Sequence, residues 1–350
     1  MRPEESALLE DLNTHRRTVD TDYFDLSLRE LARMVEQEEI RIAPEFQRQF
    51  RWNSETQSAL IESFLLGLPI PAIFVATNID GTWELVDGLQ RICTVLRFFG
   101  VDAPESPKLK FSQDILELEE LRTLKNFEGL RYQDLPRPIR LTLERRYLRV
   151  QVLSDKSDVE VRFELFRRLN AGAIALTPQE IRACIFQGSF NVLLSDLAEY
   201  QPYRMLLKLQ KKDTSNGTAE EVVLKFFAYL DEGQRFDGNV IEFLNSYMKD
   251  HQNETDITPY RELFTKVADY LASINPGPIL RRRTNWTPVN QIEALMVGVG
   301  RIFARGGEPV TPQGDWLNDE ELERYSKQGT NTRTNFHGRI DRAEKLFSGQ

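Results

Sequence analysis

Hydrophobic and polar positions in the first part of the chain alternate between the periods of helices and of strands. A capping residue followed by apolar positions at helical spacing predicts a helix after Ser27, a second after Asn53 or Ser54 that stops at Gly67, and a third after Gly88. Short runs rich in β-branched and aromatic residues predict strands between these helices. The predicted strands cover about residues 40–43, 72–76, 83–86 and 147–153, with a hairpin turn at 78–81.

Beyond residue 157 the strand signals stop and helical periodicity takes over. Thr177, Pro178 and Glu180 form a capping-box pattern with proline at the first helical position, which is typical of a helix N-terminus. We therefore expect an α+β protein with a mixed domain at 1–155 and an all-helical domain at 156–350. The further helices are predicted at about 162–169, 188–199, 218–231, 238–250, 259–274, 288–304, 318–327 and 333–347.

Composition narrows the class of protein. The chain has 350 residues, of which 41% are hydrophobic, and no apolar run approaches the roughly 20 residues of a membrane span. The first residues lack the apolar segment of a signal peptide, so we expect a cytoplasmic protein that does not enter the membrane. Two cysteines, Cys93 and Cys184, and three histidines are too few and too scattered for a zinc site and fit buried thiols in a reducing compartment.

The formal net charge of −9 argues against a protein that coats nucleic acid through bulk electrostatics. A local basic surface is still compatible with this charge. The triplet Arg281, Arg282 and Arg283 is a candidate for contact with nucleic acid, and the alternative is an ordinary solvated linker.

A first group of candidate functional residues lies in the segment from Ala43 to Trp52, which follows a predicted strand. It places Gln47 and Arg48 among aromatic residues. A planar guanidinium suits a phosphate, and aromatic faces can hold a base. The equally open alternative is a structural arginine–glutamate pair beside core aromatics.

A second group lies in the sequence from Glu84 to Arg91, where a buried strand leads through Gly88 into a helix. The first turn of a helix offers free backbone N–H groups and a favourable dipole, so a phosphate can bind there. Asp87 could hold a cation such as Mg²⁺, Gln90 could position water, and Arg91 could neutralise developing charge. The alternative interpretation makes Asp87 only the N-cap of the helix.

Taken together, these motifs resemble the DUF262 family, a ParB- and sulfiredoxin-like domain shared with the GmrSD-type restriction proteins. The resemblance covers about residues 25–200 and rests on four ordered segments. These are Pro44 to Arg48 with Trp52, the stretch from Leu66 to Pro71, the turn from Val86 to Arg91, and Phe166 to Gly172 followed by Leu176 to Arg182.

The resemblance implies nucleotide binding, and in some relatives NTP hydrolysis, in defence against foreign DNA. Carried over by position, it implies catalytic roles for Asp87, Gln90 and Arg91, with Mg²⁺ as a candidate companion of the NTP at Asp87. It also implies nucleotide contacts from the residues Gln47, Arg48, Gly88 and Asn170. The family usually has D-G-Q-Q-R at the turn, and Leu89 replaces the first glutamine here. Leucine can neither donate nor accept a hydrogen bond, so this replacement bears on NTP hydrolysis more than on NTP binding.

Larger relatives carry an additional HNH nuclease domain. Here His251 lacks the expected neighbouring residues, and His337 is the only histidine that follows. We therefore expect no nuclease activity of this chain itself. The main hypothesis is an NTP-binding and NTP-hydrolysing component of an antiphage or restriction-type defence system. The alternative is a non-enzymatic module that binds DNA, a partner effector nuclease or a second copy of itself.

Overall fold

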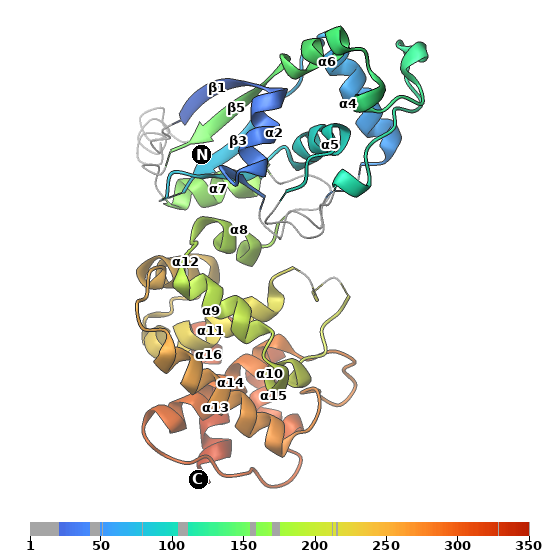
Figure 1. The fold of residues 1–350 in the computed structure, drawn as a ribbon. Coiled ribbons are helices and arrows are strands. Elements are labelled where there is room, and N and C mark those ends of the chain that lie inside the picture. The colour runs from blue at the N-terminus through green and yellow to red at the C-terminus, as the bar shows by residue number, and fades with distance from the viewer. Residues whose placement is uncertain are drawn as a thin grey trace, which may run out of the picture. The chain divides into compact units, whose positions relative to one another are not determined.

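The computed structural model divides into two compact units, Met1–Leu176 and Thr177–Gln350, each traced by colour in Figure 1. The sequence suggested a domain boundary at residue 155, whereas the two compact units divide after Leu176. The division lies later because helix α7 (Val159–Leu169) packs against strand β4 of the first unit. No helix in the described part is long and apolar enough to cross a membrane. The described residues are 21–42, 50, 52–78, 80–103, 111–154, 159–169, 176–211, 213–214, 216–327 and 329–349.

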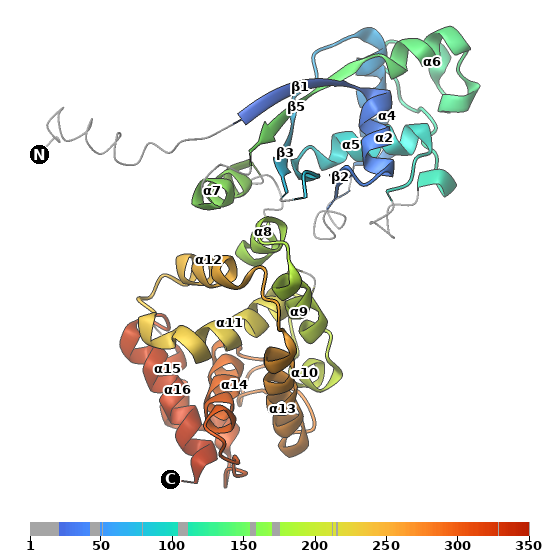
Figure 2. The same cartoon turned by 60° about the vertical axis from the view of Figure 1, so that its left-hand side comes forward.

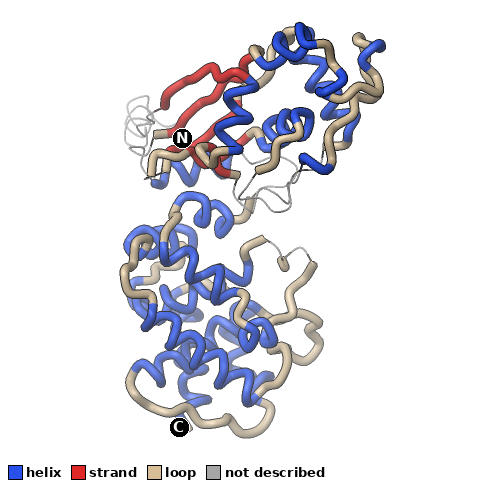
Figure 3. The backbone as a smooth tube through the Cα atoms, viewed as in Figure 1, coloured by secondary structure: helices blue, strands red, loops and turns tan. Residues whose placement is uncertain are grey.

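The first unit is built on a five-stranded mixed sheet in the order β1-β5-β3-β4-β2. Its strands are β1 (Thr21–Ser27), β2 (Ile40–Arg41), β3 (Ile73–Thr77), β4 (Trp83–Asp87) and β5 (Tyr147–Leu153). Neighbours β2/β4 and β3/β5 are parallel, whereas β1/β5 and β3/β4 are antiparallel. Within the described residues all strands belong to this unit, as the red segments of Figure 3 show, so the expected α+β class is confirmed.

Helices cover the sheet where its side chains are apolar. Helix α2 (Leu28–Glu36) packs against α5 (Leu89–Phe99), and α5 packs against α4 (Ser54–Leu66). Figure 2 shows these three helices on one side of the sheet and α7 on the other. The predicted caps are confirmed: Ser27 accepts a hydrogen bond from the N–H of Glu30, and Asn53 accepts one from the N–H of Thr56. Gly67 ends α4 in the left-handed conformation.

Strand β1 and helix α6 (Arg137–Glu144) were missed from the sequence. The side chains of β1 are mostly exposed, because one face of the β1/β5 pair is open to solvent. On that face Asp25 pairs with Arg149, and Tyr23 accepts a hydrogen bond from Gln151. A strand with little burial on either face lacks the hydrophobic alternation that marks strands in a sequence.

The second unit is helical throughout its described part. The predicted capping box is confirmed, since the side chains of Thr177 and Glu180 each bond the other's backbone N–H. Every helix predicted in this region is present; the short α10 (Gln201–Leu206) was missed because it spans only 6 residues. The helices are α8 (Pro178–Ile185), α9 (Ser189–Ala198), α10, α11 (Thr218–Glu232), α12 (Val240–His251), α13 (Thr258–Ile274), α14 (Val289–Ala304), α15 (Glu320–Lys327) and α16 (Arg333–Ser348).

Candidate functional site

The turn between β4 and α5 is shaped by Gly88. Its φ of 107° lies in the left-handed region, and a Cβ there would stand 2.3 Å from Cγ2 of Ile73. Only glycine therefore fits this position. Gly88 itself is the N-cap of α5 and offers no side-chain hydrogen bond, so the interpretation of Asp87 as the cap is wrong. The carboxylate of Asp87 is left for another partner.

That partner is Arg91, one helical turn further on. Its Nη2 donates to Oδ2 of Asp87 at 2.6 Å, and the two side chains are 15% and 35% exposed, respectively. Nε of Arg91 is buried and has no acceptor among the described residues. A buried N–H group normally finds an acceptor, so this donor is one hydrogen bond short within the described part of the chain.

Gln90 has a specific partner in the structure. Its Oε1 accepts a hydrogen bond from the backbone N–H of Trp52 at 3.1 Å. The carbonyl of Trp52 accepts a second bond, from Nε2 of the buried Gln57 at 2.7 Å, and Oε1 of Gln57 in turn accepts one from Arg97. Gln90 thus joins the first turn of α5 to the end of the segment that carries the first motif.

The start of that segment lies at the same edge of the sheet. Strands β2 and β4 are parallel, with Arg41 opposite Glu84, so both strands end toward the Asp87 turn. At the other end of the first motif, Trp52 contacts the turn through Gln90. Two predicted nucleotide contacts, Gln47 and Arg48, lie outside the described residues.

Asn170, another of the four implied nucleotide contacts, also lies outside the described residues. Leu89, where the family usually has glutamine, is buried at 6% exposure and packs in the core of the unit. The structure thus brings together Asp87, Gly88, Gln90 and Arg91 at one helix N-terminus.

A magnesium ion would find few protein ligands at this turn. Within the described ranges, no group of three or more histidine, cysteine or acidic side chains could hold a metal ion. Asp87 is a single carboxylate that already contacts Arg91. Magnesium commonly binds through one or two carboxylates together with substrate phosphates and water. Asp87 fits that mode of binding, with the phosphates as the other ligands.

The three arginines proposed for nucleic-acid contact do not form one surface. Arg281 turns inward, where its Nε donates to Gln291 and burial lowers the pKa of its guanidinium. Arg282 is 76% exposed and pairs with Asp315 at 2.5 Å. Arg283 is exposed and has a left-handed backbone with φ 67°. Only Arg282 and Arg283 therefore face solvent.

His251, which lacks the sequence context of an HNH motif, is half-buried. Its ring stacks on that of Tyr247, with centroids 4.0 Å apart, and lies near Phe190 and Tyr260. This aromatic cluster gives His251 a packing role at the end of α12.

The link between Gln57, Trp52 and Gln90 was missed by the sequence reasoning. One signal was available: Gln57 interrupts the apolar positions of α4 with an amide that the structure buries completely. A buried amide requires polar partners, but the sequence does not tell which ones.

Comparison with known families adds to this geometry. Residues 31–187 match the family model described as the GmrSD restriction endonuclease, N-terminal domain. The resemblance inferred from the motifs is thereby confirmed over this part of the chain. Neither the curated proteins nor the solved structures contain a significant match.

Proposed function

We propose, from the premise that residues 31–187 form a domain of the GmrSD N-terminal family, that this protein binds an NTP at the Asp87 turn and hydrolyses it. In this proposal the hydrolysis serves a restriction-type system that senses foreign DNA. The observation that carries it is the hydrogen bond from the N–H of Trp52 to Oε1 of Gln90, which joins the end of the first motif to the turn of the second.

The chemistry of the turn suits a polyphosphate. The first turn of α5 offers backbone N–H groups to an anion, and Gly88 lets a ligand approach closely because it has no side chain. Arg91 supplies a partly exposed guanidinium beside the turn. Asp87 would orient the attacking water or hold the Mg²⁺ that accompanies an NTP. Gln90 would hold the loop in place rather than position water, since its Oε1 accepts from Trp52.

The experiment measures phosphate release and binding of a fluorescent NTP by the purified chain, with each common NTP and Mg²⁺. Asp87→Asn should reduce release at least a hundredfold, and Arg91→Ala should weaken NTP binding. The matched control is Asp25→Asn, which breaks an ion pair of the same sheet with Arg149 and should leave both measurements unchanged. Undiminished turnover in the Asp87 and Arg91 variants would exclude this site.

We further propose that any cleavage of DNA is carried out by a separate effector protein, which the NTP state of this chain would regulate. A plasmid-nicking assay with Mg²⁺ tests this proposal. The purified chain should leave the plasmid intact at every NTP concentration, and nicking that depends on this chain alone would contradict the proposal.

A further inference from the structure

Two segments of the helical unit, 206–211 and 279–287, are joined by backbone hydrogen bonds. The N–H of Ile279 donates to the carbonyl of Leu206 at 2.9 Å. The N–H of Lys208 donates to Oγ1 of Thr287, whose own N–H donates to the carbonyl of Lys208, both at 2.9 Å. These bonds hold the two segments side by side, and with them the side chains that the segments carry. We call the exposed side chains of Lys208, Lys211, Arg282, Arg283 and Trp286 the Trp286 surface.

Trp286 is the centre of this surface. Its side chain is 43% exposed, whereas Trp83 and Trp316 are half-buried and pack on Phe24 and Phe347. Nζ of Lys208 lies 5.7 Å from the centroid of the Trp286 ring. An exposed indole beside a cation is an arrangement that binds aromatic ligands carrying negative charge. The indole can stack on the aromatic ring of the ligand, and the cation can neutralise the ligand's negative charge.

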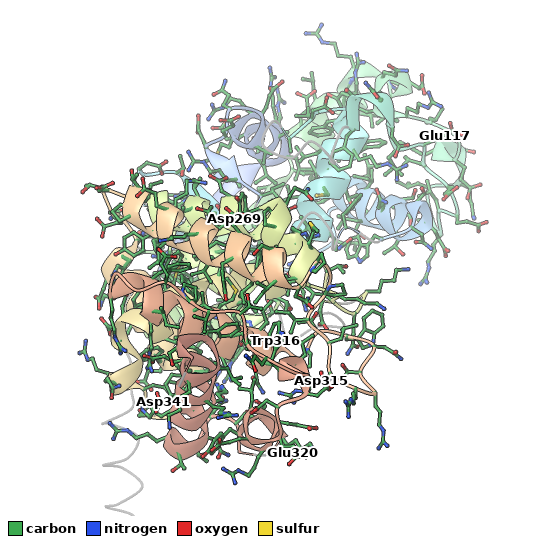
Figure 4. The ribbon with its side chains drawn as sticks, turned by 90° about the horizontal axis from the view of Figure 1, so that it is seen from below. Glu117, Asp269, Asp315, Trp316, Glu320 and Asp341 are labelled. Atoms are coloured by element: carbon green, nitrogen blue, oxygen red, sulfur yellow. The ribbon has the colours of Figure 1, made fainter. Side chains whose placement is uncertain are left out.

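The two joined segments carry several basic side chains, of which Lys208 lies nearest to the ring. Arg282 is neutralised by Asp315, which Figure 4 labels next to Trp316. With the other described residues, Lys208, Lys211 and Arg283 form no salt bridge, although all three are exposed. Three basic side chains without a salt bridge on two joined segments stand out in a chain whose net charge is −9.

We infer that the Trp286 surface binds single-stranded DNA. Trp286 stacks on an unpaired base, while Lys208, Lys211 and Arg283 contact the neighbouring phosphates. A duplex fits less well, because the faces of its bases are covered by their neighbours and an exposed indole could not stack on them. This inference rests on the DNA-sensing part of the proposed function, but it does not involve the Asp87 turn.

The first test measures binding of a fluorescein-labelled oligothymidylate of about 20 nucleotides, long enough to span a typical site, by anisotropy. Trp286→Ala in the full chain should weaken binding about tenfold, the loss expected for one stacked base. Trp286→Phe should retain most of the affinity, since it keeps an aromatic face. Tyr147→Ala, which removes an aromatic side chain that is 63% exposed in the first unit, is the matched control and should change nothing.

A second test separates phosphate contacts from stacking. Replacing Lys208, Lys211 and Arg283 together by alanine should lower the slope of log affinity against log salt by about 2. The charge control is Lys345→Ala on α16, which should keep the slope of the parent protein. Circular dichroism of each variant verifies that the helices are retained.

Three outcomes would overturn the inference: no binding of the oligonucleotide by the parent protein, equal affinity of Trp286→Ala and the parent, or duplex binding as tight as single-strand binding. NTP binding is measured on the same samples. If NTP binding is intact and DNA binding is absent, only this inference fails. If Asp87→Asn keeps NTP turnover while Trp286→Ala loses DNA, only the assigned nucleotide site fails.

Discussion

The two units differ in where their most connected ion pairs lie. In the first unit the ion pairs Asp87–Arg91 and Asp25–Arg149 stay partly in contact with solvent. In the helical unit a chain of charges runs through the interior, across α8, α11, α14 and α16. Charges that remain accessible can take a ligand, whereas buried charges satisfy one another and hold helices in register.

The buried chain consists of alternating cations and carboxylates. Arg182 donates to Glu221 at 2.6 Å, and Lys225 contacts both Glu221 at 2.9 Å and Glu293 at 3.0 Å. Arg339 lies 3.9 Å from the other oxygen of Glu293. Burial by itself lowers the pKa of Lys225, but the two carboxylates outweigh it and raise the pKa above its usual value. The lysine therefore stays charged inside the unit.

The largest effect is expected for Glu293→Ala, which leaves two buried cations without their shared carboxylate. We expect the free energy of unfolding of the helical unit to fall by about 3–5 kcal/mol, measured by urea denaturation. Asp341→Ala removes the exposed partner of Arg301, which keeps its contact with Glu344, and should cost no more than about 1 kcal/mol. If the two variants lost the same free energy of unfolding, burial would not determine how much these charges contribute to stability.

An intermediate effect is expected for Gly88→Ala at the candidate site. The new Cβ would clash with Ile73 and require a left-handed backbone, so the first unit should lose about 2–3 kcal/mol. Gly81→Ala is the matched control, because its φ of 82° is also left-handed but nothing lies within 4 Å of its Cβ position. It should lose about 1 kcal/mol. Thermal denaturation of both variants separates the clash from the backbone strain.

A smaller, pH-dependent effect is expected for Glu62, a carboxylate that the first unit does bury. Burial raises its pKa, but the N–H groups of Leu124, Thr123 and Arg122 outweigh burial, so the pKa lies below its usual value. A carboxyl with a lowered folded pKa stabilises the protein above its unfolded pKa and loses that contribution as pH falls through the folded pKa.

Glu62→Gln should therefore cost about 1–2 kcal/mol at neutral pH, and the difference from the parent should shrink as pH falls below about 4. Urea denaturation across this range measures it. The charge control is Glu128→Gln, which removes an exposed carboxylate that pairs with Lys125 and should give no comparable pH dependence. A difference between parent and Glu62→Gln that stays constant with pH would contradict the ionised state of Glu62.

Much of the fold followed from local patterns. The caps at Ser27, Asn53 and Thr177 began helices where the sequence predicted them, because an N-cap and its first turn are separated by only three residues. The turn from Asp87 to Arg91 was also found this way. Strand β1 escaped, since its stability comes from pairing with β5, which lies more than a hundred residues away in the chain.

For the candidate site, the sequence determined the residue types and the turn that carries them, since a strand, a glycine and a helix start are consecutive in the chain. Tertiary structure alone decided the long-range contacts: Trp52 as the partner of Gln90, and an inward position for Arg281. It also decided that the charges of Arg182, Lys225 and Glu293 are buried. Hydrogen bonds and ion pairs between distant segments depend on how those segments pack. Hydrophobic periodicity does not predict which distant segments will pack together.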